Sequence, residues 1–181
     1  MPLLTPDTVY FKDIQSTYLK PGESRNYKFN AVFRGVVNIK VLCDSPIIVG
    51  IAASKPEKHV IKGSKEFNYQ VEPDTEIYVS IQCKKGLFAK PANTTIAIEM
   101  LAPKRVIEFY TKVKNVLSMI SEAQEFYEVH KRTIRELLDD SVSVWHLLGE
   151  EARQVVKDLV LTVKKLDGDL AEKEYESIKY D

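Results

Sequence analysis

Two lysine-rich segments contain the residues best suited to contact another molecule. They span 54–66 (SKPEKHVIKGSKE) and 83–90 (CKKGLFAK), and both are interpreted as loops. A basic loop that exposes an aromatic side chain can meet an acidic partner or an anionic lipid surface. Alternatively, both are solvated turns, and the phenylalanine folds back onto the ends of the strands. The binding residues that we predict are Lys58, Lys62, Lys84, Lys85, Leu87 and Phe88.

The sequence offers little for catalysis. It contains no phosphate loop, dinucleotide fingerprint, zinc-protease HExxH or nucleophile-elbow GxSxG motif. The three histidines, His59, His130 and His146, do not form the paired Glu-x-x-His spacing of a metal site in a helical bundle. We therefore expect a non-enzymatic protein that uses no cofactor and no metal.

Cys43 and Cys83 each continue the apolar face of a predicted strand. The simplest interpretation is that both are small buried hydrophobic residues. A disulfide bridge between two sheets is the alternative, and a reducing compartment argues against it.

Composition limits the classes of partner. Lysine plus arginine and aspartate plus glutamate both number 26, so the formal net charge is zero. Nucleic-acid-binding proteins usually carry a net basic field, so we expect no nucleic acid. The N-terminus lacks the charged and apolar regions of a signal peptide, and no apolar run is long enough to span a membrane. These features predict a cytoplasmic protein, and peripheral membrane contact is not favoured.

Residues 1–102 are predicted to form an antiparallel β-sandwich domain. Apolar residues alternate with polar ones in runs such as GVVNIKVLC and EIYVSIQC, which is typical of strands with one buried face. Clusters of proline, glycine and aspartate interrupt these runs as turns do. The expected strands, about eight, are 8–15, 17–20, 25–32, 36–43, 47–53, 66–71, 76–83 and 94–101.

Residues 103–181 are predicted to be helical, because the apolar period changes to three or four residues near Ala102. The expected helices are 103–138, 141–166 and 170–179. The first would be roughly 50 Å long, and a short connection predicts that it forms a hairpin with the second. The fold class is therefore α+β, with a sandwich followed by a helical hairpin.

The first predicted helix carries a broad apolar stripe with two interpretations. It can pack against the second helix and the sandwich, or it can hold two copies of the chain together as in a coiled coil. A helix longer than its own domain favours the second interpretation. The predicted oligomerisation residues recur every seven positions: Val106, Val113, Ile120, Tyr127 and Ile134.

The strand region resembles one known family. The segments YLKPGESRNYKF, VNIKVLCDSPIIVGI and EPDTEIYVSIQC, with NTTIAIEM after them, are similar to the GOLD (Golgi-dynamics) domain of p24-type cargo receptors. In that family a late strand ending in cysteine leads to a final strand and then a coiled coil. The position of this chain's first cysteine departs from the family, and we expect neither the leader nor the membrane anchor of that family here. The resemblance implies a non-catalytic, protein-binding sandwich with a helical oligomerisation segment.

Together these features predict an interaction or assembly module. Its sandwich loops would contact a protein partner, and its helices would form a homo-oligomer. The alternatives are a structural component of a larger particle or envelope, and an enzyme or ligand carrier whose site lies between the sandwich and the helices.

Overall fold

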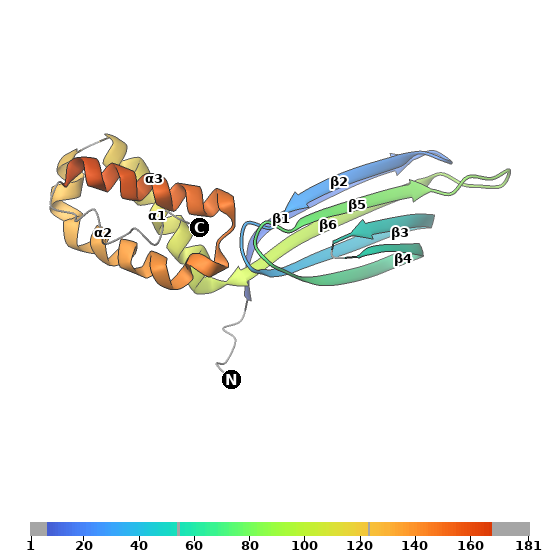
Figure 1. The fold of residues 1–181 in the computed structure, drawn as a ribbon. Helices are drawn as coiled ribbons and strands as arrows, with labels where there is room; N and C mark the ends of the chain where they lie inside the picture. Colours follow the sequence, from blue (N-terminus) through green and yellow to red (C-terminus); the bar gives the residue numbers. More distant parts are fainter. Residues whose placement is uncertain (1–6, 54, 123, 168–181) are drawn as a thin grey trace.

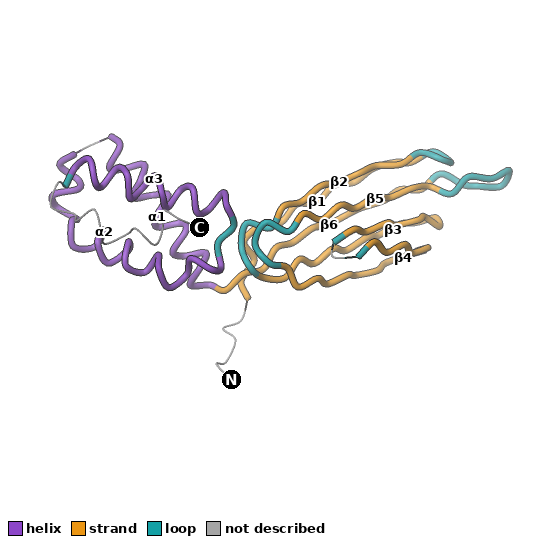
Figure 2. Tube along the Cα trace, viewed as in Figure 1, coloured by secondary structure: helices purple, strands orange, loops and turns teal. Residues whose placement is uncertain are grey.

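The structure is a computed structural model that describes residues 7–53, 55–122 and 124–167. Strands form one end of an elongated molecule and helices the other (Figures 1 and 2). The predicted α+β class is confirmed. In chain order the elements are β1 (Asp7–Leu19), β2 (Ser24–Asn30), β3 (Gly35–Ala52), β4 (Pro56–Val71), β5 (Glu76–Cys83), β6 (Ala92–Pro103), α1 (Lys104–Glu122), α2 (Gln124–Val144), a 3-10 turn (Trp145–Leu147) and α3 (Glu150–Leu166).

The strands form one antiparallel sheet that folds over on itself. Its order is β1-β6-β3-β5-β2, and β4 also pairs with β3. Residues 36–43 of β3 pair with β6, whereas residues 47–52 pair with β5. The register shifts between Cys43 and Ile47, so β3 and β4 turn together from one layer into the other. The result is a two-layered structure in which β1 and β2 are each an edge of one layer, and β4, which pairs only with β3, is the other edge of both.

The number of strands differs from the prediction. Segments 8–15 and 17–20 belong to one strand, and 36–43 and 47–53 are the two arms of β3. The predicted loop 54–66 is mostly the first arm of β4. Its side chains are mostly exposed polar groups, so it lacks the apolar alternation by which the other strands are recognised.

Within 104–122 and 124–167 the chain forms three α-helices, and the predicted long first helix is not one of them. The predicted helix 103–138 corresponds to α1 and much of α2, which fold back on each other (Figure 1). The next break lies at Gly149 and not at the predicted residues 139–141. Among the described residues each helix contacts the other two. The predicted helix 170–179 lies outside the described residues.

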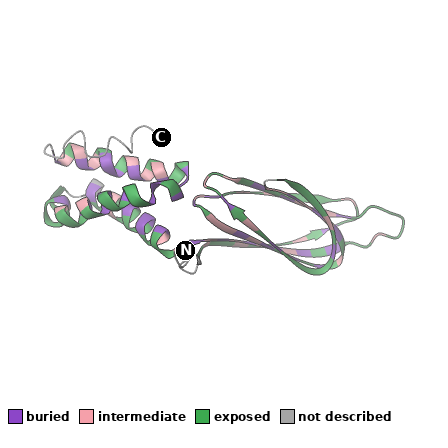
Figure 3. Ribbon diagram, turned by 60° about the horizontal axis from the view of Figure 1, so that its bottom comes forward, coloured by how far each residue is buried: buried purple, intermediate pink, exposed green. Residues whose placement is uncertain are grey.

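Because α1 and α2 fold back on each other, the stripe of apolar residues that recur every seven positions is buried inside the chain. Val106, Val113, Ile120, Tyr127 and Ile134 are all between 0% and 3% exposed. A straight helix would extend past the strands and leave part of this apolar stripe in water, so the chain gains hydrophobic free energy by folding back. Their side chains already pack in the core of one chain, so the structure does not favour the predicted self-association through them. Figure 3 shows that buried residues recur along the helices.

The strands fix the start of α3 through the turn between β4 and β5. Asp74 accepts the backbone N–H of Glu150 at 2.9 and 3.1 Å with its two carboxylate oxygens. The N–H of Gly149 donates to the carbonyl of Val32 at 2.6 Å. A β-carbon at position 149 would lie 2.7 Å from Asp74 Oδ1. The close approach of turn and helix therefore requires glycine there.

Aromatic rings fill the junction between strands and helices. Phe33 packs edge-on against Tyr10 and Tyr110, with ring centroids 4.7 and 5.3 Å apart. Such edge-to-face pairs stabilise a contact beyond the area that they bury. This packing does not favour the alternative of an active or carrier site between the sandwich and the helices.

Candidate functional site

Three chain reversals meet at the end of the strands that lies farthest from the helices (Figure 2). They are residues 20–23, the bend of the β3–β4 ribbon at 44–46 and 62–64, and the loop 84–91. The N–H of Gly22 donates to the carbonyl of Cys83 at 3.1 Å, and the Cys83 N–H donates to the carbonyl of Glu23 at 2.9 Å. We call these segments the distal end.

The loop 84–91 carries the most exposed large apolar side chains of the described residues. Leu87 is 95% exposed and Phe88 is 91% exposed. The alternative in which Phe88 folds back onto the strands is therefore wrong. A soluble domain exposes isolated apolar residues routinely, but two adjacent ones at the tip of a projecting loop indicate a contact surface.

Hydrogen bonds hold the loop at its base. The Cys83 thiol donates to the carbonyl of Lys90 at 3.2 Å, and the N–H of Ala89 donates to the carbonyl of Gly86 at 3.1 Å. Gly86 has a φ of +155°. The first bond joins the two ends of the loop, the second closes the turn at its tip, and the Leu87 and Phe88 side chains lie in solvent.

In the described part of the chain, the lysines of the distal end are unpaired, as are Lys58 and Lys65 on β4, whereas other strand lysines form ion pairs. Among the described residues, strand lysines such as Lys12 and Lys40 pair with glutamates across the sheet. Within the residues that the structure describes, no lysine of the distal end forms an ion pair. These exposed lysines are Lys20, Lys62, Lys84, Lys85 and Lys90.

The two acidic groups of the distal end are held by other partners. Glu23 accepts the backbone N–H of Lys20 at 2.9 Å. Asp44 accepts the side-chain and backbone N–H groups of Asn93 at 2.6 and 2.8 Å, and these bonds hold the pKa of its carboxyl below the usual range. With five lysines and two acids, the distal end has a net charge of +3.

The structure brings together most, but not all, of the predicted binding residues. Lys84, Lys85, Leu87 and Phe88 lie in one loop, and Lys62 lies beside the bend. Lys58 is opposite Gly50 in the paired part of β4, away from this bend. The prediction that 54–66 is a loop is therefore wrong, because residues Pro56–Val71 form β4, and binding through Lys58 stays a prediction.

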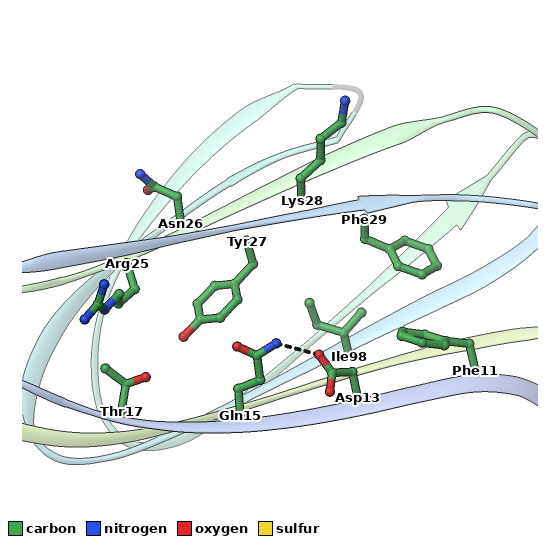
Figure 4. A pocket seen from close by; sticks show the side chains of 10 residues that line it. All are labelled: Phe11, Asp13, Gln15, Thr17, Arg25, Asn26, Tyr27, Lys28, Phe29 and Ile98. Atoms are coloured by element: carbon green, nitrogen blue, oxygen red, sulfur yellow. Dashed lines mark hydrogen bonds between the residues drawn. The ribbon is translucent and has the colours of Figure 1, made fainter.

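A cleft between the free edges of β1 and β2 was missed by the sequence analysis. Its volume is about 560 Å³ (Figure 4). Ten residues line it: Phe11, Asp13, Gln15, Thr17, Arg25, Asn26, Tyr27, Lys28, Phe29 and Ile98. The alternation of polar residues at odd positions of β1 is the pattern that could have indicated it, because an inward-facing polar row is unusual in a sandwich.

Hydrogen-bonding and aromatic side chains line the two walls of the cleft. The Gln15 amide donates to the Asp13 carboxylate at 2.7 Å, and Phe11 stacks with Phe29 at 5.7 Å between ring centroids. Tyr27 and Arg25 add hydrogen-bonding groups on the other wall (Figure 4). The lining includes neither histidine nor cysteine, so it lacks the usual base and the strongest nucleophile of covalent catalysis.

The histidines and cysteines of the described residues are hydrogen-bonded, exposed or buried in the core, and they do not gather into one site. His59 bonds to Glu57 and Lys65 at 3.2 Å, and the other two histidines are exposed. Both cysteines are free and buried, as the simpler interpretation predicted, and burial raises the pKa of the Cys43 thiol. Within 7–53, 55–122 and 124–167, no cluster of three potential metal ligands occurs. No helix in these ranges is both long and apolar enough to cross a membrane.

Comparison with known proteins identifies no family. No family model matches the chain, and no curated protein matches it in sequence. The resemblance to the GOLD domain therefore stays a prediction.

Solved structures show distant similarity over about half of the chain. A de novo designed double-stranded β-helix matches with a TM-score of 0.34 and 11% identity, covering 48% of this chain and 99% of the design. The Aeromonas hydrophila periplasmic lysozyme inhibitor PliG matches at 0.38 and 6%, covering 49% and 85%. The Drosophila melanogaster CENP-C cupin domain matches at 0.31 and 17%, covering 48% and 59%.

Proposed function

We propose that this protein is a non-enzymatic docking module that binds its partner through the distal end. The observation that carries this proposal is the exposure of Leu87 and Phe88, which are 95% and 91% accessible although the chain buries a large apolar core elsewhere. Fully burying such a side chain contributes about 1.5–3 kcal/mol. A partner that covers both would therefore gain a useful binding free energy.

The fixed base of the loop supports the same proposal. Binding costs less when the contacting segment is already ordered, because less conformational entropy is lost. The bonds of Cys83 to Lys90 and of Ala89 to Gly86 order the loop in the free protein. The bend of β3 and the turn 20–23 flank this loop and widen the contact surface.

Site-specific photo-crosslinking tests the proposal without assuming what the partner is. A benzoylphenylalanine would be introduced at position 88 and, as the matched control, at Val129, which is 77% exposed on α2. We expect adducts from position 88 in cells that express the protein, and few or none from position 129. Equal adducts at both positions, or none at position 88, would contradict the proposal.

A further inference from the structure

We infer that the surface to which the distal end docks is an anionic lipid membrane. This inference rests on the proposed docking function and names the partner. It departs from the expectation of a protein partner, because the structure adds observations on charge, shape and orientation that the sequence alone lacks.

The charge of the loop is the first of these observations. Residues 84–91 carry three lysines and no acidic residue. Their ammonium groups form no ion pair among the described residues, whereas Lys12, Lys28 and Lys40 on the strands do. Unpaired lysines on a convex surface are available to the phosphates and carboxylates of lipid headgroups. Each contributes about five-fold to membrane partitioning near an anionic surface.

The shape of the loop is the second observation. Figure 1 shows the 84–91 loop projecting beyond the end of β2, away from the helices. A protein partner would need a pocket shaped for both Leu87 and Phe88. A fluid bilayer accepts a projecting apolar pair without such a pocket, and the long lysine side chains can stay at headgroup level while their stems lie along the apolar region.

The distribution of charge along the molecule is the third. The described helical residues, 104–122 and 124–167, hold 11 basic and 11 acidic residues and are neutral in sum, while the distal end carries +3. The positive charge is therefore concentrated at the end of the molecule that carries the 84–91 loop. Near an anionic membrane, this difference orients the protein with the 84–91 loop toward the lipid and the helices away from it.

Vesicle co-sedimentation of the full chain tests the inference. The probes are phosphatidylcholine vesicles with and without phosphatidylserine. We expect binding to the anionic vesicles, weaker binding to the neutral ones, and loss of binding when salt shortens the Debye length from about 10 Å to about 3 Å. Phe88→Ser should weaken binding about ten-fold or more. The double variant Lys84→Glu/Lys85→Glu should weaken it at least about 25-fold, since both lysines are lost.

Matched variants on the helical end serve as controls. Lys112→Glu/Lys165→Glu makes the same change in net charge on exposed helical positions, and Val129→Ser removes an exposed apolar side chain there. Both should bind vesicles like the parent protein. Circular dichroism melting of every variant checks that loss of binding is not loss of fold.

The results separate failure of the inference from failure of the proposed function. If no vesicle binds the parent protein, or if the lysine variant binds as the parent does, the lipid inference is overturned. The docking function still stands if position 88 crosslinks to a protein in cells. If position 88 crosslinks to neither lipid nor protein, the docking function fails as well.

Discussion

At the scale of single residues, Asp74 joins the two ends of the molecule. Its carboxylate accepts the N–H of Glu150 and so caps α3 from a turn between strands. Its backbone has a φ of +64°, a left-handed conformation that asparagine and aspartate tolerate better than most residues. One residue therefore provides both the turn and the cap.

Asp74→Ala should lower the free energy of unfolding by about 0.5–2 kcal/mol, since it removes the cap and strains the turn. Asp74→Asn keeps an accepting oxygen and should stay close to the parent. Urea denaturation of both, with Glu72→Ala as an exposed control in the same turn, measures the difference. Equal stabilities for the alanine and asparagine variants would contradict the capping role.

Tyr127 makes stability depend on pH in the alkaline range. Its buried hydroxyl donates to Asp167 at 2.6 Å, and Lys131 and Arg135 also contact that carboxylate at 2.9 Å. Burial, together with the bond to Asp167, raises the pKa of Tyr127 to about 12. An unfolded tyrosine titrates near pH 10. The stabilisation is thus complete below about pH 10 and is lost as the pH rises toward about 12.

Tyr127→Phe should remove part of this alkaline loss and cost about 1 kcal/mol of hydrogen-bond stabilisation at neutral pH. Unfolding by urea between about pH 8 and about pH 11 would measure both effects. Tyr18→Phe, at a 55% exposed position, is the control. An alkaline slope identical to that of the parent would mean that Tyr127 does not contribute.

At the scale of elements, the apolar stripe with its seven-residue repeat lies in the core of one chain, and we expect no interface between copies there. Ile120→Ala should lower the free energy of unfolding by about 2–5 kcal/mol, as large-to-small core substitutions do. The melting temperature should not depend on protein concentration, because no second chain covers this residue. Met119→Ala, at a 48% exposed neighbouring position, should change stability by less than about 0.5 kcal/mol. A concentration-dependent melting temperature would instead support the stripe as an interface.

The elements show which parts of the fold a local pattern can predict. Alternation predicted β5 at its observed bounds, Glu76–Cys83, because every second side chain there is buried. Alternation did not reveal the first arm of β4, because most of its side chains are exposed and polar, as in a loop. It predicted one long helix from a continuous apolar stripe, because such a stripe is compatible with a straight helix or with two helices that fold together.

At the scale of the whole molecule, the candidate site was predictable only in part. The lysines and the adjacent Leu87 and Phe88 could be read from the sequence, but whether Phe88 faces the core or the solvent depends on the loop conformation. The sequence analysis missed the cleft, because β1 and β2 belong to different layers and meet only after β3 and β4 bend, and the polar alternation in β1 is the one local pattern that points to it. Lys62 joins the site through the same bend.

The arrangement as a whole assigns different roles to its two ends. The distal end carries unpaired lysines and an exposed apolar pair, while the described helical residues have no net charge and bury their apolar stripe. The central claim is that the distal end enters an anionic membrane while the helices stay in water.

Fluorescence of a dye attached at position 88 tests this claim most directly. Both native cysteines are buried, so a polarity-sensitive thiol dye will label Phe88→Cys or, as the control, Val129→Cys selectively. On addition of phosphatidylserine-containing vesicles, the account predicts a blue shift of the dye at position 88 and no shift at position 129. A shift at position 129 alone, or at neither position, would contradict it.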